Sequence, residues 1–408
     1  FDDYANLFRI FFLIAGIIVL ISSNEFVKSR IKYQGEFYGI LIFTILAGML
    51  LSSSSELLTA YISLELLSFG LYVLVAFDRY NIKSNESGVK YVLLGAFSSA
   101  LILYGISNIY GVLGTTRFDE ISLMLTSIDD LNPFLILGFI FLFAGLGFKL
   151  SAVPFHMWAP DVYEGSPTSV TSFFAIVPKI AAISVFIRFM YVPFINVINE
   201  WQLIIIFLSV GSMILGAVAA IGQTNIKRLI AYSTIGHMGY ILAGLATGTS
   251  EGVQSSIIYL TIYLIMNLGA FGCIFMMKRE NIYSENIYDL SGLSKNHPML
   301  ALGFLILFFS LAGIPPLAGF FAKFYVFMSV IEAKMYTLAI IGLLSTVVSA
   351  FYYLRVIKII YFDKPRKEFD ECYDWGLKSI LIMSSVIILF YFVNPSILTN
   401  VISSIVIN

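Results

Sequence analysis

The sequence predicts an all-α protein, a polytopic bundle of membrane helices, on three observations. Of the 408 residues, 59% are hydrophobic and only 12% carry a charge, whereas about 25% of a soluble domain is charged. Apolar runs of about 20 residues, the length that a helix needs to cross a bilayer core, recur along the whole chain. Lysine and arginine gather in alternate connections between these runs, as expected for a multispanning protein.

About twelve apolar runs meet this length requirement. They lie at residues 5–24, 35–53, 56–78, 89–112, 132–158, 168–192, 201–222, 228–247, 252–277, 298–330, 335–361 and 375–394. The longest connections, 113–131 and 278–297, are predicted to be polar loops. No predicted connection is large enough to form a soluble domain.

The basic residues orient the bundle. Counted over alternate connections, one set carries only Arg117, Arg188 and Lys334. The set that starts after the first span carries Lys28, Arg30, Lys32, Arg79, Lys83, Lys227, Arg228, Lys278, Arg279, Lys295, Arg355, Lys358, Lys364, Arg366 and Lys367. By the positive-inside rule, this bias predicts that both ends of the chain lie outside. It also supports the number of spans, because one missed span would scramble the alternation.

Two of the runs are too long for a single span. As one helix, 132–158 would extend about 40 Å, against a bilayer core of about 30 Å, and 298–330 is longer still. The first contains Pro154 and the second contains Pro315 and Pro316. Because proline lacks a backbone donor and clashes with the preceding turn, both runs are predicted to be broken helices.

The breaks are placed symmetrically. Helices two to six (35–192) and seven to eleven (201–361) form two groups, and the fourth member of each is broken. An odd number of spans inverts the second group relative to the first, and inverted repeats with paired broken helices are typical of transporters. Residues 1–34 are predicted to hold a preceding helix, and residues 362–408 a last helix and a tail.

Several classes of function lack support. The two cysteines, Cys273 and Cys372, lie far apart, and the three histidines form no cluster with them, so no metal or redox centre is expected in this chain. No phosphate-binding glycine motif is present, and a net charge of −1 gives no indication of nucleic-acid binding. Because the chain starts at Phe1, we expect a natural N-terminus that is missing or processed.

Three lysines, Lys149, Lys179 and Lys323, fall at membrane depth, where a charge is costly and indicates a function. Lys179 follows Pro178, which should leave the carbonyl of Phe174 without its helical donor. Burial disfavours a charged lysine, so reversible protonation near neutral pH is expected. The alternative is a structural lysine paired with a carboxylate or a carbonyl.

Glu65 and His237 also lie at depth. If their helices pack together, Glu65 and Lys149 form a buried ion pair that a third charge can open; alternatively, the pair is a static bridge between helices. Lys323 has no obvious partner in the sequence and either takes part in proton transfer or extends to the interface. His237 is interpreted equally well as a relay or as a hydrogen-bonded packing residue.

Other charged residues lie near the inner surface. Lys90 has no clear role, and Glu86 is interpreted as an interface anchor. His156, Asp161 and Glu164, after the first break, form a predicted site of proton uptake, with helix capping as an equal alternative.

Three stretches resemble a known family. They are GLGFKLSAVPFHMWAPDVYEGSPT at 145–168, NIKRLIAYSTIGHMGY at 225–240 and LAGIPPLAGFFAKF at 311–324. They are similar to the antiporter-like membrane subunits of respiratory complex I, and most similar to the subunit N family, whose mitochondrial version is subunit two. The resemblance covers nearly the whole chain and implies that the first two helices of the family are absent from it.

The resemblance also assigns residues. Glu65 matches the glutamate of the fifth family helix, Lys149 the lysine of the seventh, Lys179 that of the eighth, and Lys323 the terminal residue of the twelfth. Related M-type and sodium/proton antiporter subunits usually have glutamate at this last position, so lysine favours subunit N. The implied function is redox-driven proton translocation, in which the Glu65–Lys149 pair controls Lys179, and His237 carries a proton towards Lys323.

The resemblance further implies the surroundings of the chain. NADH, FMN, iron–sulfur clusters and quinone are expected in partner subunits and no cofactor in this chain. The expected partners are the other membrane-arm subunits, antiporter-like and small, together with lipids. The expected location is the mitochondrial inner membrane, with the bacterial plasma membrane as the alternative. A subunit of a multisubunit monovalent cation/proton antiporter is the competing function, and a scaffold that only seals the arm is a more distant one.

Overall fold

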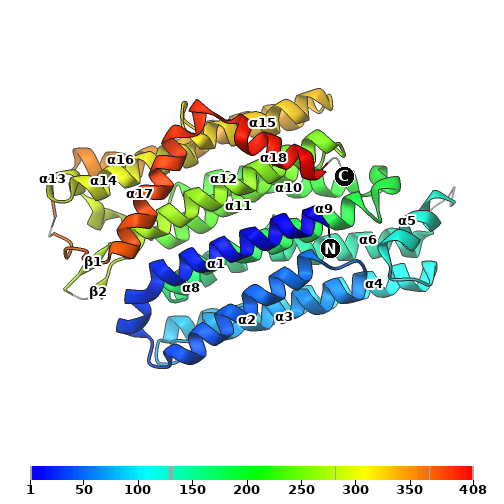
Figure 1. Ribbon diagram of the computed structural model, residues 1–408, viewed down its shortest axis with the longest axis horizontal. Helices are drawn as coiled ribbons and strands as arrows, with labels where there is room; N and C mark the ends of the chain where they lie inside the picture. Colours follow the sequence, from blue (N-terminus) through cyan, green and yellow to red (C-terminus); the bar gives the residue numbers. More distant parts are fainter. Residues whose placement is uncertain (1, 128–131, 281, 367, 407–408) are drawn as a thin grey trace.

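The computed structural model describes residues 2–127, 132–280, 282–366 and 368–406. Nearly all of them lie in long helices that run side by side (Figure 1). Ten helices of the described residues are long and apolar enough to cross a membrane. The other two predicted spans are helix α11 (Ile226–Leu245) and the broken pair α14 (Pro298–Ala312) and α15 (Ala318–Glu332). The predicted all-α membrane bundle is therefore confirmed.

Among the described residues, the first half of the chain forms nine α-helices. They are α1 (Asp3–Arg30), α2 (Gln34–Ser52), α3 (Leu57–Val75), α4 (Ile82–Leu113), α5 (Phe118–Thr126), α6 (Pro133–Leu150), α7 (Trp158–Gly165), α8 (Thr168–Phe174) and α9 (Val177–Tyr191). Helix α5 is short and lies in the connection 113–131 that was predicted as a loop. Residues 128–131 of that connection lie outside the described residues.

The second half follows the short helix η1 (Ile195–Val197). Its elements are α10 (Ile198–Ala220), α11 (Ile226–Leu245), α12 (Ser250–Phe275), β1 (Lys278–Arg279), β2 (Ile282–Tyr283), η2 (Ile287–Leu290), α13 (Leu293–Asn296), α14 (Pro298–Ala312), α15 (Ala318–Glu332), α16 (Tyr336–Phe362), α17 (Trp375–Phe390), η3 (Tyr391–Val393) and α18 (Ser396–Val406). The antiparallel hairpin β1–β2 and the helix α18 were not predicted. Figure 1 places both chain ends at one end of the bundle and this hairpin at the other.

Both predicted breaks are present. Helix α6 ends at Leu150, and Ser151 takes a left-handed conformation with φ 62°. Helix α14 ends at Ala312, and Gly313 takes the same conformation with φ 87°. A left-handed residue is a common end of a helix because it frees the chain to turn away while the last carbonyls find other donors. Glycine adopts this conformation readily, whereas serine adopts it at a cost.

A third interruption was only partly predicted. The run 168–192, expected as one helix with a kink at Pro178, divides into α8 and α9, with Ala175 and Ile176 between them. Pro178 stands in the first turn of α9, where its missing N–H has no helical acceptor to lose. The proline therefore starts a new helix instead of bending a continuous one.

Close helix packing depends on Gly216 of α10. A Cβ atom there would lie 2.5 Å from the backbone nitrogen of Gly236 in α11 and 2.8 Å from the carbonyl oxygen of Tyr232. We expect Gly216→Ala to separate α10 from α11 and to destabilise the protein by about 1–3 kcal/mol, the usual effect of overpacking. Gly272→Ala is the matched control, because Gly272 is also buried in a helix and has no atom within 4 Å of its Cβ position. Thermal unfolding of the detergent-solubilised variants measures the difference; equal midpoints would contradict the prediction.

Candidate functional site

The structure brings Glu65 of α3 and Lys149 of α6 together. The Nζ atom of Lys149 lies 3.3 Å from Oε1 of Glu65 and donates to Oγ of Ser68 at 2.8 Å. Oγ of Ser99 donates to the same Glu65 oxygen at 2.6 Å. The side chains of Lys149 and Glu65 are only 9% and 14% exposed. The predicted ion pair therefore exists, supported by hydroxyl groups from α3 and α4.

Lys179 binds the end of the first broken helix. Its Nζ atom donates to the carbonyl of Leu150 at 3.0 Å and to Oγ of Ser151 at 2.5 Å, and lies 3.5 Å from the carbonyl of Lys149. The ring of Trp158 lies 5.2 Å from it. The last carbonyls of a helix carry partial negative charge, so they favour an ammonium group. In the described ranges no carboxylate pairs with this fully buried lysine.

Two tyrosines donate hydrogen bonds to the backbone carbonyls that the interruption before Lys179 leaves without helical donors. The hydroxyl of Tyr263 in α12 donates to the carbonyl of Ala175 at 3.1 Å and lies 2.9 Å from Oγ1 of Thr234. The hydroxyl of Tyr163 in α7 lies 3.5 Å from the carbonyl of Phe174. The expectation that Pro178 frees the Phe174 carbonyl is thus met, and its replacement donor comes from outside the helix.

Lys323 of α15 repeats the arrangement of Lys179 at the second break. Its Nζ atom donates to the carbonyls of Ala312 at 2.9 Å and Leu311 at 3.3 Å, at the end of α14. The ring of Tyr240 lies 5.2 Å from it, where Trp158 lies for Lys179. Lys323 is 5% exposed. It therefore does not extend to an interface, and the carbonyls of its own broken helix are partners that the sequence could not reveal.

His237 lies beside Lys323 in a polar network. Its Nδ1 atom lies 2.7 Å from the hydroxyl of Tyr259, and its Nε2 atom 3.1 Å from that of Tyr353, which also bonds Ser233. A cavity of about 10 Å³ is lined by His237, Lys323 and Tyr353, among others. This volume is the minimum that a single water molecule requires. His237 is therefore well bonded, as its packing interpretation requires, and close enough to Lys323 to serve as a relay.

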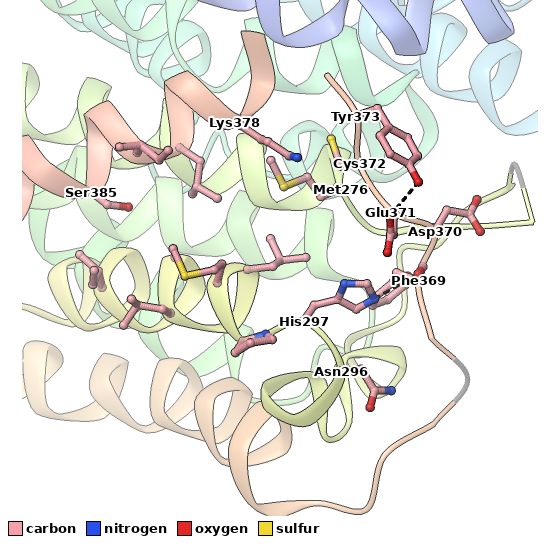
Figure 2. Close-up of a pocket in the computed structure, with 18 of the residues that line it drawn as sticks. Met276, Asn296, His297, Phe369, Asp370, Glu371, Cys372, Tyr373, Lys378 and Ser385 are labelled. Atoms are coloured by element: carbon pink, nitrogen blue, oxygen red, sulfur yellow. Dashed lines mark hydrogen bonds between the residues drawn. The ribbon is translucent and has the colours of Figure 1, made fainter. Parts of the chain in front are cut away.

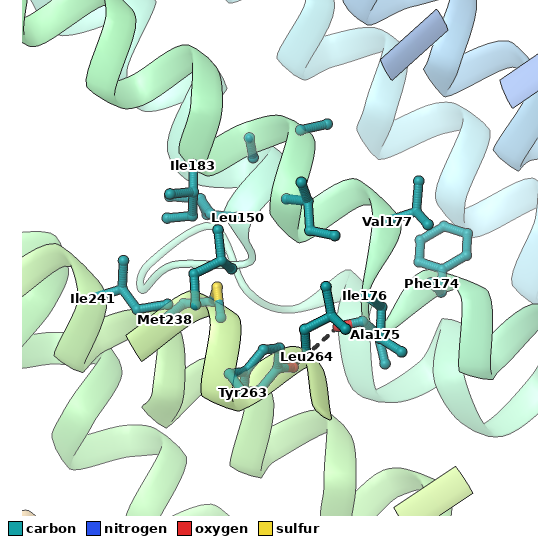
Figure 3. Close-up of a cluster of buried hydrophobic side chains, with 14 of the residues drawn as sticks. Leu150, Phe174, Ala175, Ile176, Val177, Ile183, Met238, Ile241, Tyr263 and Leu264 are labelled. Carbon is teal, nitrogen blue, oxygen red and sulfur yellow. Dashed lines mark hydrogen bonds between the residues drawn. The ribbon is translucent and has the colours of Figure 1, made fainter. Parts of the chain in front are cut away.

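A layer of buried apolar side chains, called the apolar layer here, lies where α6, α9 and α11 meet. Figure 3 shows Leu150, from the end of α6, between Ile183 of α9 and the pair Met238 and Ile241 of α11. All four are fully buried. Through the described part of the chain, no hydrogen bond joins Lys179 directly to His237. Tyr263 approaches both sides: its ring centre lies 5.4 Å from that of His237, and its hydroxyl donates to the carbonyl of Ala175.

Lys227, at the start of α11, is a buried charge that the sequence analysis counted only as a loop charge. Its side chain is 2% exposed, its Nζ atom lies 2.6 Å from Oε1 of Glu285, and it donates to the carbonyl of Ser166 at 2.9 Å. It lines a cavity of about 140 Å³ at the inner end, together with Lys83 and Glu164. A count of loop charges treats Lys227 and its neighbour Arg228 alike, so it could not show that Lys227 is buried.

The predicted uptake residues are only partly brought together. Arg228 donates to Asp161 at 2.7 Å and to Glu164 at 3.2 Å, and Lys90 lies 3.0 Å from Asp161 and 2.8 Å from Glu86. Partial burial opposes ionisation of Asp161, but the hydrogen bonds from Lys90 and Arg228 outweigh it and lower the pKa of this carboxyl.

His156 is separate from this ion-pair cluster. Its Nδ1 atom is buried and has no partner in the part of the chain that the structure describes.

Comparison with known proteins identifies the family. A model of the family described as NADH:quinone oxidoreductase/Mrp antiporter matches residues 54–349. NADH-quinone oxidoreductase subunit N of Pelagibacter ubique is 55% identical over 404 residues, which cover 99% of this chain and 85% of that protein. This chain belongs to the subunit N family of NADH-quinone oxidoreductase. The Rhodospirillum rubrum member of the subunit N family is 47% identical, covering 98% of this chain and 82% of its own length.

Solved structures agree with the subunit N assignment. A chain of respiratory complex I from Thermus thermophilus superposes with a TM-score of 0.83 at 30% identity, covering 98% of this chain and 86% of that one. A chain of the Mrp complex from Dietzia superposes with a TM-score of 0.86, covering 98% of this chain and 82% of that one, but at 19% identity. The second match shows a shared fold only. The predicted resemblance to complex I is confirmed.

Proposed function

We propose that this chain translocates protons in the membrane arm of NADH-quinone oxidoreductase through Glu65, Lys149, Lys179, His237 and Lys323. The observation that carries the proposal is the repeated arrangement at the two breaks, where a buried lysine binds the last carbonyls of a broken helix. Each lysine is held by neutral oxygen atoms and an aromatic ring instead of a carboxylate. Because no carboxylate is paired with either lysine, the lysine can lose its proton without leaving an unpaired buried charge behind.

The pair Glu65–Lys149 is the controlling element of the proposal. The backbone of Lys149 belongs to the same helix end that binds Lys179, so its side chain and Lys179 share one short segment. When a charge from a neighbouring subunit separates Lys149 from Glu65, the ammonium of Lys149 is no longer neutralised. Its positive charge then repels the proton on Lys179, because charges interact strongly in a buried, poorly screened site.

The released proton crosses the apolar layer when water enters it. His237 accepts the proton at a ring nitrogen and passes it to Lys323, from which it leaves to the outside. Tyr263 bounds the layer on the side of α12 and offers its hydroxyl as a polar contact between the α8–α9 interruption and Thr234.

Lys227 is proposed to load protons from the inner side. Its cavity opens near Ser166, whose hydroxyl lies 2.8 Å from that of Thr171, and Thr171 donates to the carbonyl of Tyr163. These hydroxyl groups lead from the cavity towards the α8–α9 interruption.

Replacing Lys227 by methionine is expected to lower the rate of proton translocation several-fold, because Glu285 and the Ser166 carbonyl lose their shared donor. Proton uptake by the complex in proteoliposomes measures the rate. Lys83→Met is the control, since Lys83 lines the same cavity but its side chain is 72% exposed. A rate for Lys227→Met equal to that of the control would remove Lys227 from the path.

The rest of the machinery is assigned to partner subunits. NADH, FMN, iron–sulfur clusters and quinone are bound there in this proposal, and this chain contributes no cofactor site. The chain is a multi-pass membrane protein. Of the two membranes expected from the sequence, the bacterial plasma membrane is favoured over the mitochondrial inner membrane, because the relatives named above are bacterial.

A native gel of a mild-detergent extract tests the assembly. We expect the chain to migrate with flavin and iron–sulfur subunits in a band that oxidises NADH. Migration only with other hydrophobic antiporter-like subunits, without NADH oxidation, would instead support a monovalent cation/proton antiporter. The family model includes Mrp antiporters, and the Mrp complex shares the fold of this chain.

A further inference from the structure

A large groove between α14 and α17 plays no part in the proton path. Its volume is about 630 Å³, and it lies at the end of the bundle that the loop charges predict to face inside; Figure 2 shows residues that line it. Both helices begin at this end, near the connection that carries Phe369 to Tyr373. Its apolar wall is formed by Met299, Leu302, Ile306, Leu381, Ile382 and Val386.

The groove has the depth of one bilayer leaflet. From Lys378 to Leu389, both lining residues of α17, the helix rises about 16 Å at 1.5 Å per residue. One leaflet contributes half of a core of about 30 Å. The wall residues Met299, Ile382 and Val386 are 72%, 56% and 47% exposed, so they face an apolar neighbour outside this chain. An extended acyl chain fits this depth and this lining.

The mouth of the groove holds a cation with no anionic partner. Lys378 lines the groove, and its Nζ atom lies 5.7 Å from the ring centre of Trp375. Across the described ranges, no carboxylate or hydrogen-bond acceptor contacts this ammonium group. In Figure 2 Lys378 points into the space between α17 and the connection.

The acidic groups at the rim have other partners. Glu371 accepts from the hydroxyl of Tyr373 at 2.7 Å, and Asp370 accepts from the backbone of Glu280 at 3.0 Å. Among the described residues, neither forms an ion pair with Lys378. An unpaired lysine above an apolar groove, at the depth of a membrane surface, has the chemistry that an anionic headgroup requires.

We propose that this groove binds one glycerophospholipid of the inner leaflet. The phosphodiester lies on Lys378, and one acyl chain lies between α14 and α17. The phosphodiester is common to phosphatidylethanolamine and phosphatidylglycerol, so Lys378 recognises the class rather than one headgroup. Tyr373 and Trp375, 76% and 81% exposed at the same rim, are residue types that occupy the headgroup region.

Photolabelling of the assembled complex tests the site. The complex is reconstituted into vesicles of phosphatidylethanolamine and phosphatidylglycerol, in which one or the other carries a diazirine on its acyl chain. After irradiation, labelled peptides are mapped by mass spectrometry. We expect labels on α14 and α17 at groove residues, a several-fold loss of these labels in Lys378→Gln, and retention in Lys378→Arg. Labelling by both lipids indicates recognition of the phosphodiester, and labelling by one alone narrows the site to that headgroup.

The control is Lys364→Gln, an exposed lysine of the inner surface that does not line the groove. It should leave the labels unchanged. Equal labelling of wild type and Lys378→Gln overturns the proposal, since the lipid would then be unspecific. Absence of groove labels, with cross-links from α14 or α17 to a partner subunit instead, also overturns it and assigns the groove to a protein contact. NADH oxidation by each variant verifies that the complex is assembled.

Discussion

Replacing Lys179 by methionine is expected to abolish proton pumping while leaving the complex assembled. Methionine fills the volume of the lysine stem but has no proton to transfer. It also leaves the Leu150 carbonyl and the Ser151 hydroxyl without their donor, which costs about 1–3 kcal/mol for each buried group. These losses are expected to lower stability without preventing assembly, whereas the loss of pumping is complete.

Lys179→Arg separates charge from proton transfer. Arginine keeps a permanent positive charge that can bind the same carbonyls, but it does not deprotonate in proteins. We expect assembly close to wild type and no pumping. Proton uptake into proteoliposomes, together with NADH oxidation and a native gel, measures the three properties. Pumping at the wild-type proton ratio in Lys179→Met would exclude Lys179 from the relay.

Replacing Glu65 by glutamine is expected to reduce both pumping and assembly. Glutamine still offers an oxygen to Ser99, but it no longer balances the buried charge of Lys149. Removing one partner of a buried ion pair usually costs about 3–5 kcal/mol, and the 14% exposure of Glu65 places the cost near the lower end. Glu86→Gln is the matched control, because that glutamate is 60% exposed on the neighbouring helix.

The double variant Glu65→Gln/Lys149→Met distinguishes a controlling pair from a static bridge. It removes both charges, so assembly should recover relative to Glu65→Gln alone. Pumping should stay low, because no charge remains to act on Lys179. If pumping returned with assembly, the pair would serve only to hold α3 against α6, and the control of Lys179 would have to come from elsewhere. Native-gel abundance and proton uptake are compared for the two single variants and the double variant.

The sequence predicted the burial of the three lysines at membrane depth but not that of Lys227, and it predicted a contact only for Lys149. Lys149 and Glu65 could be paired from their types, since an ion pair is the usual solution for opposite charges at depth. Lys179 and Lys323 bind backbone carbonyls, which every residue has, so no pattern of residue types identifies such partners. The proline-containing runs did predict the two helix ends that expose these carbonyls, because a span has a maximum length.

Other features depended on tertiary packing. The burial of Lys227 follows from its contacts with Glu285 and Ser166, far away in the sequence, and its neighbour Arg228 is more exposed. A count of charges along the sequence cannot distinguish Lys227 from Arg228. The helix α18 lies beyond the last predicted span and is shorter than a span, so a search for long apolar runs omits it. The division of the chain into two inverted repeats at 35–192 and 201–361 stays a prediction.

The apolar layer around Leu150, Met238 and Ile241 has a consequence for the cell that holds this protein. A continuous polar route through a membrane would discharge the gradient that respiration builds, whether or not any electron flowed. In the path proposed above, fully buried aliphatic side chains interrupt the route, so we expect the idle subunit to be an electrical insulator. Copies awaiting assembly, or complexes starved of NADH, would therefore draw no leak current, and the membrane would stay energised between turnovers.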